Sequence, residues 1–132
     1  LSMLAGSPGL GKSQVSLSIA ASISSGSSWP VSRVKAPQGD VIILSMEDRA
    51  EDTIKPRLEA CGANLSRVHI ITDVEDEEGS RPFNPQGDLG LLEEAIEANG
   101  KVSLVIIDPI SAYLGKADAR HNCKAQPTIG TF

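Results

Sequence analysis

Residues 6–13, GSPGLGKS, fit the pattern G-x-x-x-x-G-K-[ST] of a phosphate-binding loop. Glycines let a backbone wrap closely around a phosphate, and successive N–H groups then form a nest for its oxygens. In such a loop Lys12 would bridge the β- and γ-phosphates of a nucleotide, and the Ser13 hydroxyl would ligate Mg²⁺. The alternative is a chance glycine turn, but an apolar run precedes the motif and a helical pattern follows it. The predicted nucleotide site comprises Gly6, Ser7, Pro8, Gly9, Leu10, Gly11, Lys12, Ser13 and Gln14.

A nucleotide held with Mg²⁺ needs a partner acid, and the apolar run at residues 102–107 ends in Asp108. In an open parallel sheet, functional acids lie at the carboxyl ends of strands, beside the phosphate loop. We therefore expect Asp108 to hold Mg²⁺, directly or through water. Because Asp-Pro is a common turn signal, the alternative is that Asp108 only starts a turn at Pro109.

A second apolar run, residues 41–46, is followed by Glu47 and Asp48. Since Pro109 follows Asp108, no glutamate adjoins the first acid, and Glu47 is the best-placed general base for an attacking water. Glu47 and Lys12 are thus the predicted catalytic residues. An ordinary exposed acid is the alternative for Glu47, whereas Asp48 has the Asp-x-x-Glu spacing of a helix cap.

Alternating strand and helix patterns must position these residues. Strands are predicted at residues 2–5, 40–46, 68–72 and 101–108, helices at 12–24, about 48–62 and 89–98, and loops at 25–39 and 73–87. Residues 116–132 show no sustained period. Right-handed crossovers between such strands predict an α/β fold, a parallel sheet with helices on both faces.

The composition limits the function classes that fit. The chain has 132 residues, of which 40% are hydrophobic, and a formal net charge of -5, which argues against a strong whole-domain basic field for nucleic acid. The longest apolar runs are too short to span a bilayer, so no membrane association is expected. Two cysteines, Cys61 and Cys123, form neither a disulfide framework nor a metal cluster, which favours a reduced, cytoplasmic location.

The runs AGSPGLGKS, VIILSMEDRAEDTIKPRLEACGANLSRVHII and LEEAIEANGKVSLVIIDPISAYLG resemble the RecA-like P-loop ATPases. Within them the chain is most similar to RepA-type hexameric helicases and related phage and bacterial AAA-domain proteins. The resemblance covers residues 1–115, an ATPase core, and leaves 116–132 as a divergent tail. Ser45-Met46-Glu47-Asp48 matches the S-x-E-D context of that family's catalytic glutamate, and Asp108 matches its Walker B aspartate.

The resemblance implies ATP and Mg²⁺ as cofactors, ATP hydrolysis, and a homo-oligomeric ring or filament in a full-length parent, coupled to DNA replication or repair. It also implies a three-layer α/β/α core in which a later strand separates the P-loop strand from the Walker B strand. The chain ends before that strand, so we expect a fragment, incomplete at its C-terminus, with the edge beside Asp108 unpaired. Residues 127–132 are not expected to fill that gap, because Pro127 and Gly130 suit a central strand poorly.

Two other functions remain open at this point. One is a switch module that binds ATP with little or no turnover, which the absence of a sensor strand favours. The other is a P-loop kinase that transfers phosphate to a small molecule, with Glu47 and Asp48 binding the acceptor. His69 lies within an apolar strand pattern and is predicted to be a satisfied structural residue rather than a ligand.

Overall fold

The computed structural model describes residues 1–45, 50–112 and 126–132. Its helices and strands are, in order, α1 (Lys12–Ser25), β1 (Asp40–Ser45), a π-helical turn (Ala50–Ile54), α2 (Lys55–Ala60), a 3₁₀ turn (Leu65–Arg67), β2 (Val68–Asp76), β3 (Gly79–Pro82), α3 (Leu89–Asn99), β4 (Val102–Asp108), a 3₁₀ turn (Ile110–Ala112) and β5 (Gln126–Thr131). Among these helices, none has the length and apolar character needed to cross a membrane.

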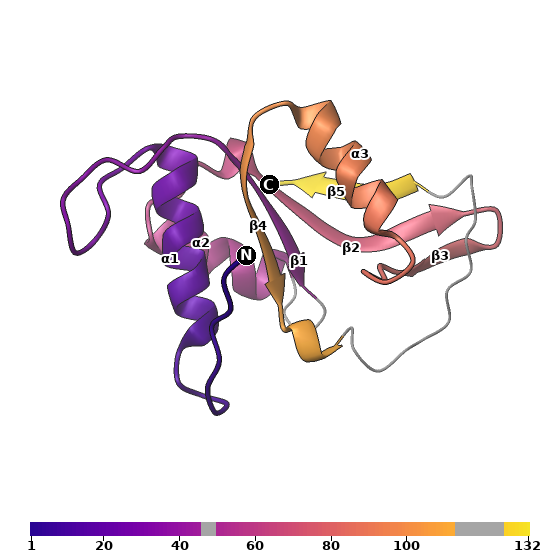
Figure 1. Ribbon diagram of the computed structural model, residues 1–132, viewed down its shortest axis with the longest axis horizontal. Coiled ribbons are helices and arrows are strands. Elements are labelled where there is room, and N and C mark those ends of the chain that lie inside the picture. The colour runs from indigo at the N-terminus through magenta and orange to yellow at the C-terminus, as the bar shows by residue number, and fades with distance from the viewer. Residues whose placement is uncertain (46–49, 113–125) are drawn as a thin grey trace.

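Strand β1 lies at the centre of the sheet, between β2 and β4, and runs parallel to both (Figure 1). Strands β3 and β5 are both antiparallel to β2. Residues 69–71 of β2 pair with β1 and also with β5, and since a strand has only two edges, β5 lies on the edge of β2 opposite β1. The sheet is therefore mixed, with the expected parallel core and two antiparallel additions.

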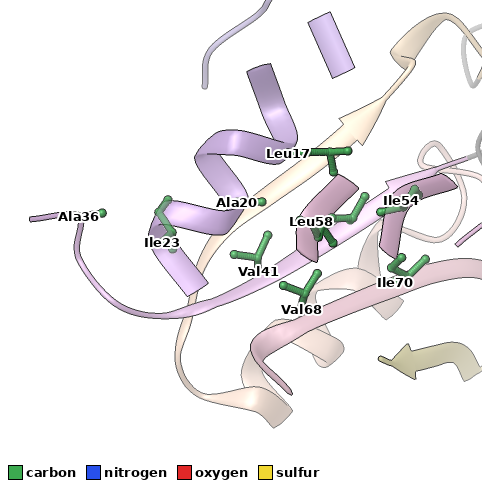
Figure 2. Packing of buried hydrophobic residues seen from close by; sticks show 10 residues of the cluster. Leu17, Ala20, Ile23, Ala36, Val41, Ile54, Leu58, Val68 and Ile70 are labelled. Atoms are coloured by element: carbon green, nitrogen blue, oxygen red, sulfur yellow. The ribbon is translucent and has the colours of Figure 1, made fainter. Parts of the chain in front are cut away.

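Helices cover both faces of this sheet. On one face, α1 and α2 pack against Val41 and Ile43 of β1, with Leu17, Ala20, Leu58 and Val68 among the buried residues (Figure 2). On the other face, α3 packs against Ile42 and Leu44. Because successive side chains of a strand point to opposite faces, the apolar run of β1 contributes to both cores. The three-layer α/β/α architecture is confirmed.

The predicted strand at residues 2–5 is wrong: residues 1–7 have no regular structure, and residues 1–11 are exposed. A single extended segment is unstable in water unless a neighbouring strand pairs with its N–H and C=O groups. Within the described part of the chain, no strand pairs with this segment. An apolar sequence of strand type was therefore insufficient to make a strand here.

The predicted loop at residues 73–87 and the unpatterned tail are also partly wrong. Strand β2 continues to Asp76 and turns back as β3, from the pair Asp76–Gly79 to the pair Asp73–Pro82. In the tail, β5 forms along β2, from the pair His69–Thr131 to the pair Glu75–Gln126. Strand β2, the partner of β5, lies on the opposite side of β1 from β4. Residues 127–132 therefore do not fill the gap beside β4, and that expectation is confirmed.

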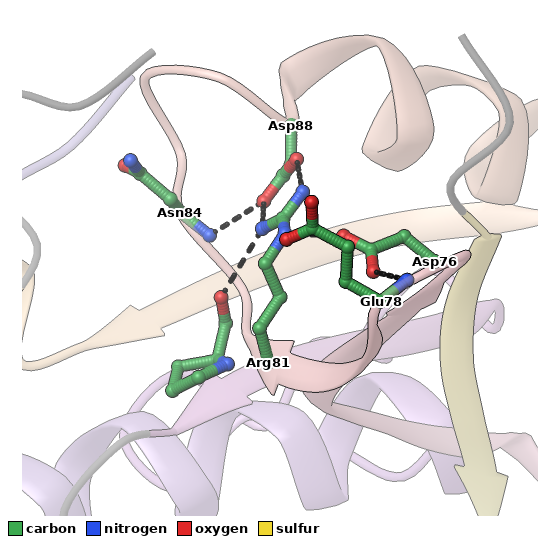
Figure 3. Close-up of polar contacts among 6 residues, drawn as sticks. Asp76, Glu78, Arg81, Asn84 and Asp88 are labelled. Atoms are coloured by element: carbon green, nitrogen blue, oxygen red, sulfur yellow. Dashed lines mark hydrogen bonds and ion pairs between the residues drawn. The ribbon is translucent and has the colours of Figure 1, made fainter. Parts of the chain in front are cut away.

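An ion-pair cluster around Arg81 holds the β2–β3 hairpin against the start of α3 (Figure 3). The Arg81 guanidinium donates two hydrogen bonds of 2.7 Å to the carboxylate of Asp88 and one of 3.1 Å to Asp76. Burial opposes ionisation of Asp88, but hydrogen bonds from Arg81 and the Asn84 N–H outweigh it and lower the pKa of the carboxyl. The bond to Asp88 in turn raises the pKa of Arg81 above its ordinary value, so both groups stay charged at neutral pH.

Candidate nucleotide-binding site

The backbone of residues 6–13 has a shape that requires glycine. Gly9 and Gly11 have φ angles of 80° and 78°, in the left-handed region that side chains rarely adopt. Gly11 is the residue immediately before α1 and caps that helix. A Cβ at Gly6 would lie 3.3 Å from Cδ1 of Leu10, across the loop. The glycine pattern therefore forms a tight turn at a helix N-terminus, as a phosphate cradle requires.

The Lys12 side chain folds back onto this loop. Its Nζ donates hydrogen bonds of 2.8 Å to the carbonyl oxygens of Gly6 and Ser7. The ammonium group therefore lies over the turn formed by the residues that precede it. A phosphate that enters the loop can accept those donors in place of the two carbonyls, because an ammonium group has three donors and no fixed plane.

The orientation of α1 places the loop at the carboxyl end of the sheet. The Gly39 N–H donates to the Ile23 carbonyl at 3.2 Å, so α1 ends where β1 begins. The 14 residues of α1 rise about 21 Å, and the six residues of β1 span about 20 Å. The start of α1 therefore lies level with the ends of β1 and β4, as the arrowheads in Figure 1 show.

Asp108 lies at this same end of the sheet. It is the last residue of β4, it is half-buried, and its register partner is Ser45, the last residue of β1. The predicted Glu47 and its neighbour Asp48 lie outside the described residues, which resume at Ala50. The structure thus places Lys12, Ser13 and Asp108 at one end of the sheet. Ser45, two residues before Glu47 in the sequence, ends β1 at the same end.

The donor set fits Mg²⁺ bound together with a nucleotide. Within residues 1–45, 50–112 and 126–132, no three His, Cys, Asp or Glu side chains gather into a metal cluster. Protein sites for Mg²⁺ commonly use one or two oxygen ligands and leave the other positions to phosphates and water. Ser13 and Asp108 supply a hydroxyl and a carboxylate of that kind, and Gly9 and Gly11 supply the turn for the phosphates.

A contact that the sequence did not indicate ties the first turn of α1 to the end of α2. Gln14 Nε2 donates a hydrogen bond of 3.2 Å to Sγ of Cys61, 47 residues further along the chain. The two residues have no shared spacing or motif, so only the packing of α1 beside α2 could reveal the contact.

His69 lies at the opposite end of the sheet and does not belong to this site. It is buried, and its Nδ1 shares a hydrogen bond of 2.9 Å with the Thr131 hydroxyl of β5. Its Nε2 is 3.6 Å from Oδ2 of Asp40 and has no hydrogen-bond partner among the described residues. The predicted structural role agrees with this position, although only one ring nitrogen is satisfied.

Comparison with known proteins identifies one family. The family model described as "AAA domain" matches residues 1–130, nearly the whole chain. No curated protein and no solved structure has significant similarity to this sequence.

Proposed function

Because the chain belongs to the AAA domain family, we propose that it binds ATP through residues 6–14 and hydrolyses it with Mg²⁺. The observation that carries this proposal is the glycine-dependent turn at the start of α1, level with Asp108 at the end of β4. ATP bound with Mg²⁺ supplies the γ-phosphate and the metal charge that stabilises the transferring group. The protein supplies the groups that orient both.

Each residue has a distinct part in this proposal. The N–H groups of the loop and the start of α1 bind the phosphate oxygens, and Lys12 moves from the carbonyls of Gly6 and Ser7 to the phosphates. The Ser13 hydroxyl and the Asp108 carboxylate hold Mg²⁺. Glu47 accepts a proton from the water that attacks the γ-phosphate, which is the role that the S-x-E-D resemblance gives it.

Binding and turnover measured on matched variants test these roles. Lys12→Ala is expected to abolish detectable ATP binding. The control is Lys35→Ala, which removes an exposed cation outside the loop and is expected to leave ATP binding unchanged. Glu47→Gln is expected to bind ATP normally and to lose turnover by a factor of roughly 10²–10⁴. Wild-type turnover in Glu47→Gln would refute the general-base role, and wild-type affinity in Lys12→Ala would refute the site itself.

A second function, an ATP-binding switch without turnover, is favoured by one observation. Along the edge of β4 away from β1, no strand pairs with β4 in the described part of the chain. The family resemblance places a strand with a γ-phosphate sensor at that position. ATP binding by the wild-type chain with no phosphate release, in the presence of Mg²⁺, would select this function over hydrolysis.

We propose further that a longer protein couples hydrolysis to work on DNA, as a ring or filament of identical subunits. The support for this role is the resemblance to RepA-type hexameric helicases, carried by residues 1–115. Stimulation of phosphate release by single-stranded DNA tests it. Turnover that DNA leaves unchanged would count against the DNA role without affecting the ATP site.

A further inference from the structure

Three positive side chains have no acidic partner in the part of the chain that the structure describes. Other cations are held in ion pairs, namely Lys55–Glu51, Arg67–Asp40 and Arg81–Asp88. Arg33, Lys35 and Lys101 are exposed, and within residues 1–45, 50–112 and 126–132 their side chains make no ion pair or hydrogen bond. The charge of these three groups is therefore not neutralised by the fold.

All three cations lie at the amino end of the sheet. Arg33 and Lys35 belong to the α1–β1 loop, residues 26–39, which projects from the end of α1 (Figure 1). Lys101 lies at the base of this loop, because its carbonyl accepts a hydrogen bond of 2.8 Å from the N–H of Asp40, where β1 begins. The unpaired positive charge is thus gathered around one loop.

Backbone hydrogen bonds hold the tip of the α1–β1 loop in a hairpin turn. The Trp29 N–H donates to the Val34 carbonyl at 2.8 Å, and the Arg33 N–H donates to the Trp29 carbonyl at 3.2 Å. Arg33 has a φ angle of 55°, in the left-handed region that residues other than glycine rarely adopt. The Trp29 side chain packs against the core that includes Ile23 of α1. A loop braced in this way loses little conformational entropy when it binds a partner.

Exposed apolar side chains lie among the cations of the loop. Val31 is 96% exposed, and Val34, which stands between Arg33 and Lys35 in the sequence, is 63% exposed. No Asp or Glu occurs in residues 1–39, so the charged side chains of the loop are all positive. A partner that fits this surface carries negative charge and offers apolar contact area beside it.

Single-stranded nucleic acid has this combination of properties. Its backbone carries a row of phosphates, and its unstacked bases offer flat apolar faces to side chains. Binding of this kind depends on local cations along the strand, so it is compatible with a net charge of -5 on the chain as a whole. A lipid surface fits less well, because Trp29, the aromatic residue of the loop, packs against the protein core.

We propose that the α1–β1 loop binds single-stranded DNA. In this proposal three cations contact phosphates and two valines contact bases, namely Arg33, Lys35, Lys101, Val31 and Val34. The inference rests on the proposed action on DNA and names the surface that carries it. One copy of the loop binds weakly, and in a ring or filament the contacts of several subunits with one strand add up.

This surface is separate from the proposed ATP site. Helix α1 carries the phosphate loop at its start and the α1–β1 loop at its end, about 21 Å away along its 14 residues. The chain can therefore hold ATP and a DNA strand at the same time. A chain that binds ATP and no DNA, or DNA and no ATP, distinguishes failure of one proposal from failure of the other.

Fluorescence anisotropy of a labelled oligo-dT strand, titrated with the whole 132-residue chain at several salt concentrations, tests the surface. The wild type is expected to bind with a dissociation constant of roughly 10⁻⁴–10⁻⁶ M and more weakly as salt rises. The double variant Arg33→Ala/Lys35→Ala is expected to bind roughly tenfold or more weakly. Its salt slope should be smaller by about 1.4, since each phosphate contact on a single strand contributes about 0.7.

Two further variants separate the contributions of charge and apolar contact. Lys55→Ala is the matched control, because Lys55 is ion-paired with Glu51, and it is expected to bind the strand as the wild type does. Val31→Ser is expected to weaken binding and to keep the wild-type salt slope, because it removes apolar contact area and no charge. The affinity for ATP is expected to be the same in all of these variants.

Three results would overturn the proposal. One is a wild type that binds no strand at low salt. Another is a double variant that binds as the wild type does, or a Lys55→Ala variant that loses as much affinity, with each variant shown by circular dichroism to be folded. The third is binding to vesicles that contain phosphatidylserine in place of the strand, which would assign the loop to a membrane surface.

Discussion

An alanine at Gly11 tests whether the shape of the loop matters for binding rather than for folding. Gly11 has a φ angle of 78°, and a Cβ placed there would meet no atom within 4 Å. The substitution therefore introduces backbone strain without a steric clash. The left-handed conformation costs a non-glycine residue about 1–2 kcal/mol.

The exposure of the loop decides where this cost is observed. The Gly11 carbonyl accepts from the Val15 N–H of α1, but residues 1–10 before it are exposed and belong to no helix or strand, so a change of φ at Gly11 moves that loop while the sheet and helices stay folded. The strain then returns when the phosphates of ATP require the original turn. A cost of about 1–2 kcal/mol corresponds to roughly fivefold to thirtyfold weaker binding. The unfolding free energy is expected to change little.

Gly62 offers a matched control elsewhere in the fold. Its φ angle is 76°, and a Cβ there also meets no atom within 4 Å. It lies just beyond α2, where its N–H donates to the Glu59 carbonyl and the next residue, Ala63, donates to Leu58. Relaxation there would break the end of a packed helix. Gly62→Ala is therefore expected to lose about 1 kcal/mol of stability and to keep its ATP affinity.

Isothermal titration calorimetry with ATP and denaturant unfolding of both variants supply the two measurements. Unchanged affinity in Gly11→Ala would refute the argument that bound phosphates need this backbone conformation. Equal losses of affinity in Gly11→Ala and Gly62→Ala would show that the effect passes through overall stability instead.

Three further predictions concern the fold, each measured by denaturant unfolding. Asp88→Asn is expected to lose about 2 kcal/mol at neutral pH, because Arg81 loses a charged partner at 2.7 Å. Since the pKa of Asp88 is lowered in the folded state, the wild type should lose this stability as the pH falls below about 4. The same loss of stability with falling pH in Asp88→Asn would contradict the assignment of that loss to Asp88. Leu58→Ala, at a fully buried position, is expected to cost about 2–5 kcal/mol, and a cost below about 1 kcal/mol would place Leu58 outside the core. Gly39→Ala should cost more than Gly62→Ala, because its Cβ would collide with the Ser103 side chain and lie 2.9 Å from a backbone carbonyl, and a smaller cost would contradict that packing.

Sequence patterns succeeded where the determining interactions are local. The helix predicted to start at Lys12 extends from Lys12 to Ser25, and the helix predicted at residues 89–98 extends from Leu89 to Asn99. Both end at glycines, Gly26 and Gly100, that adopt positive φ angles. Helix hydrogen bonds join residues four apart, so composition and spacing within one segment are enough to predict them.

The misplaced elements are strands, whose hydrogen-bond partners lie outside their own segment. Strand β3 carries the sequence GSRP, which has no apolar alternation, and it is held by pairing with β2 and by the ion pairs of Arg81. Strand β5 contains a proline and a glycine, yet it pairs with β2 more than 50 residues away. Conversely, residues 2–5 have the composition of a strand and no partner in the described part of the chain. Strand formation depends on a neighbour's backbone, which no local pattern contains.

By itself, the sequence determined the phosphate-loop motif, the acid at the end of β4 and the α/β class. Each of these depends on the residue types and the spacing of apolar residues within one segment. Tertiary structure alone decided that α1 runs from the carboxyl end of the sheet to its amino end, which brings Lys12 and Ser13 to the end that carries Asp108. It also decided that β5 pairs with β2 rather than with β4 in the described part of the chain. Both depend on which strands pair and which face each helix covers, and those choices are made by contacts between segments remote in the chain.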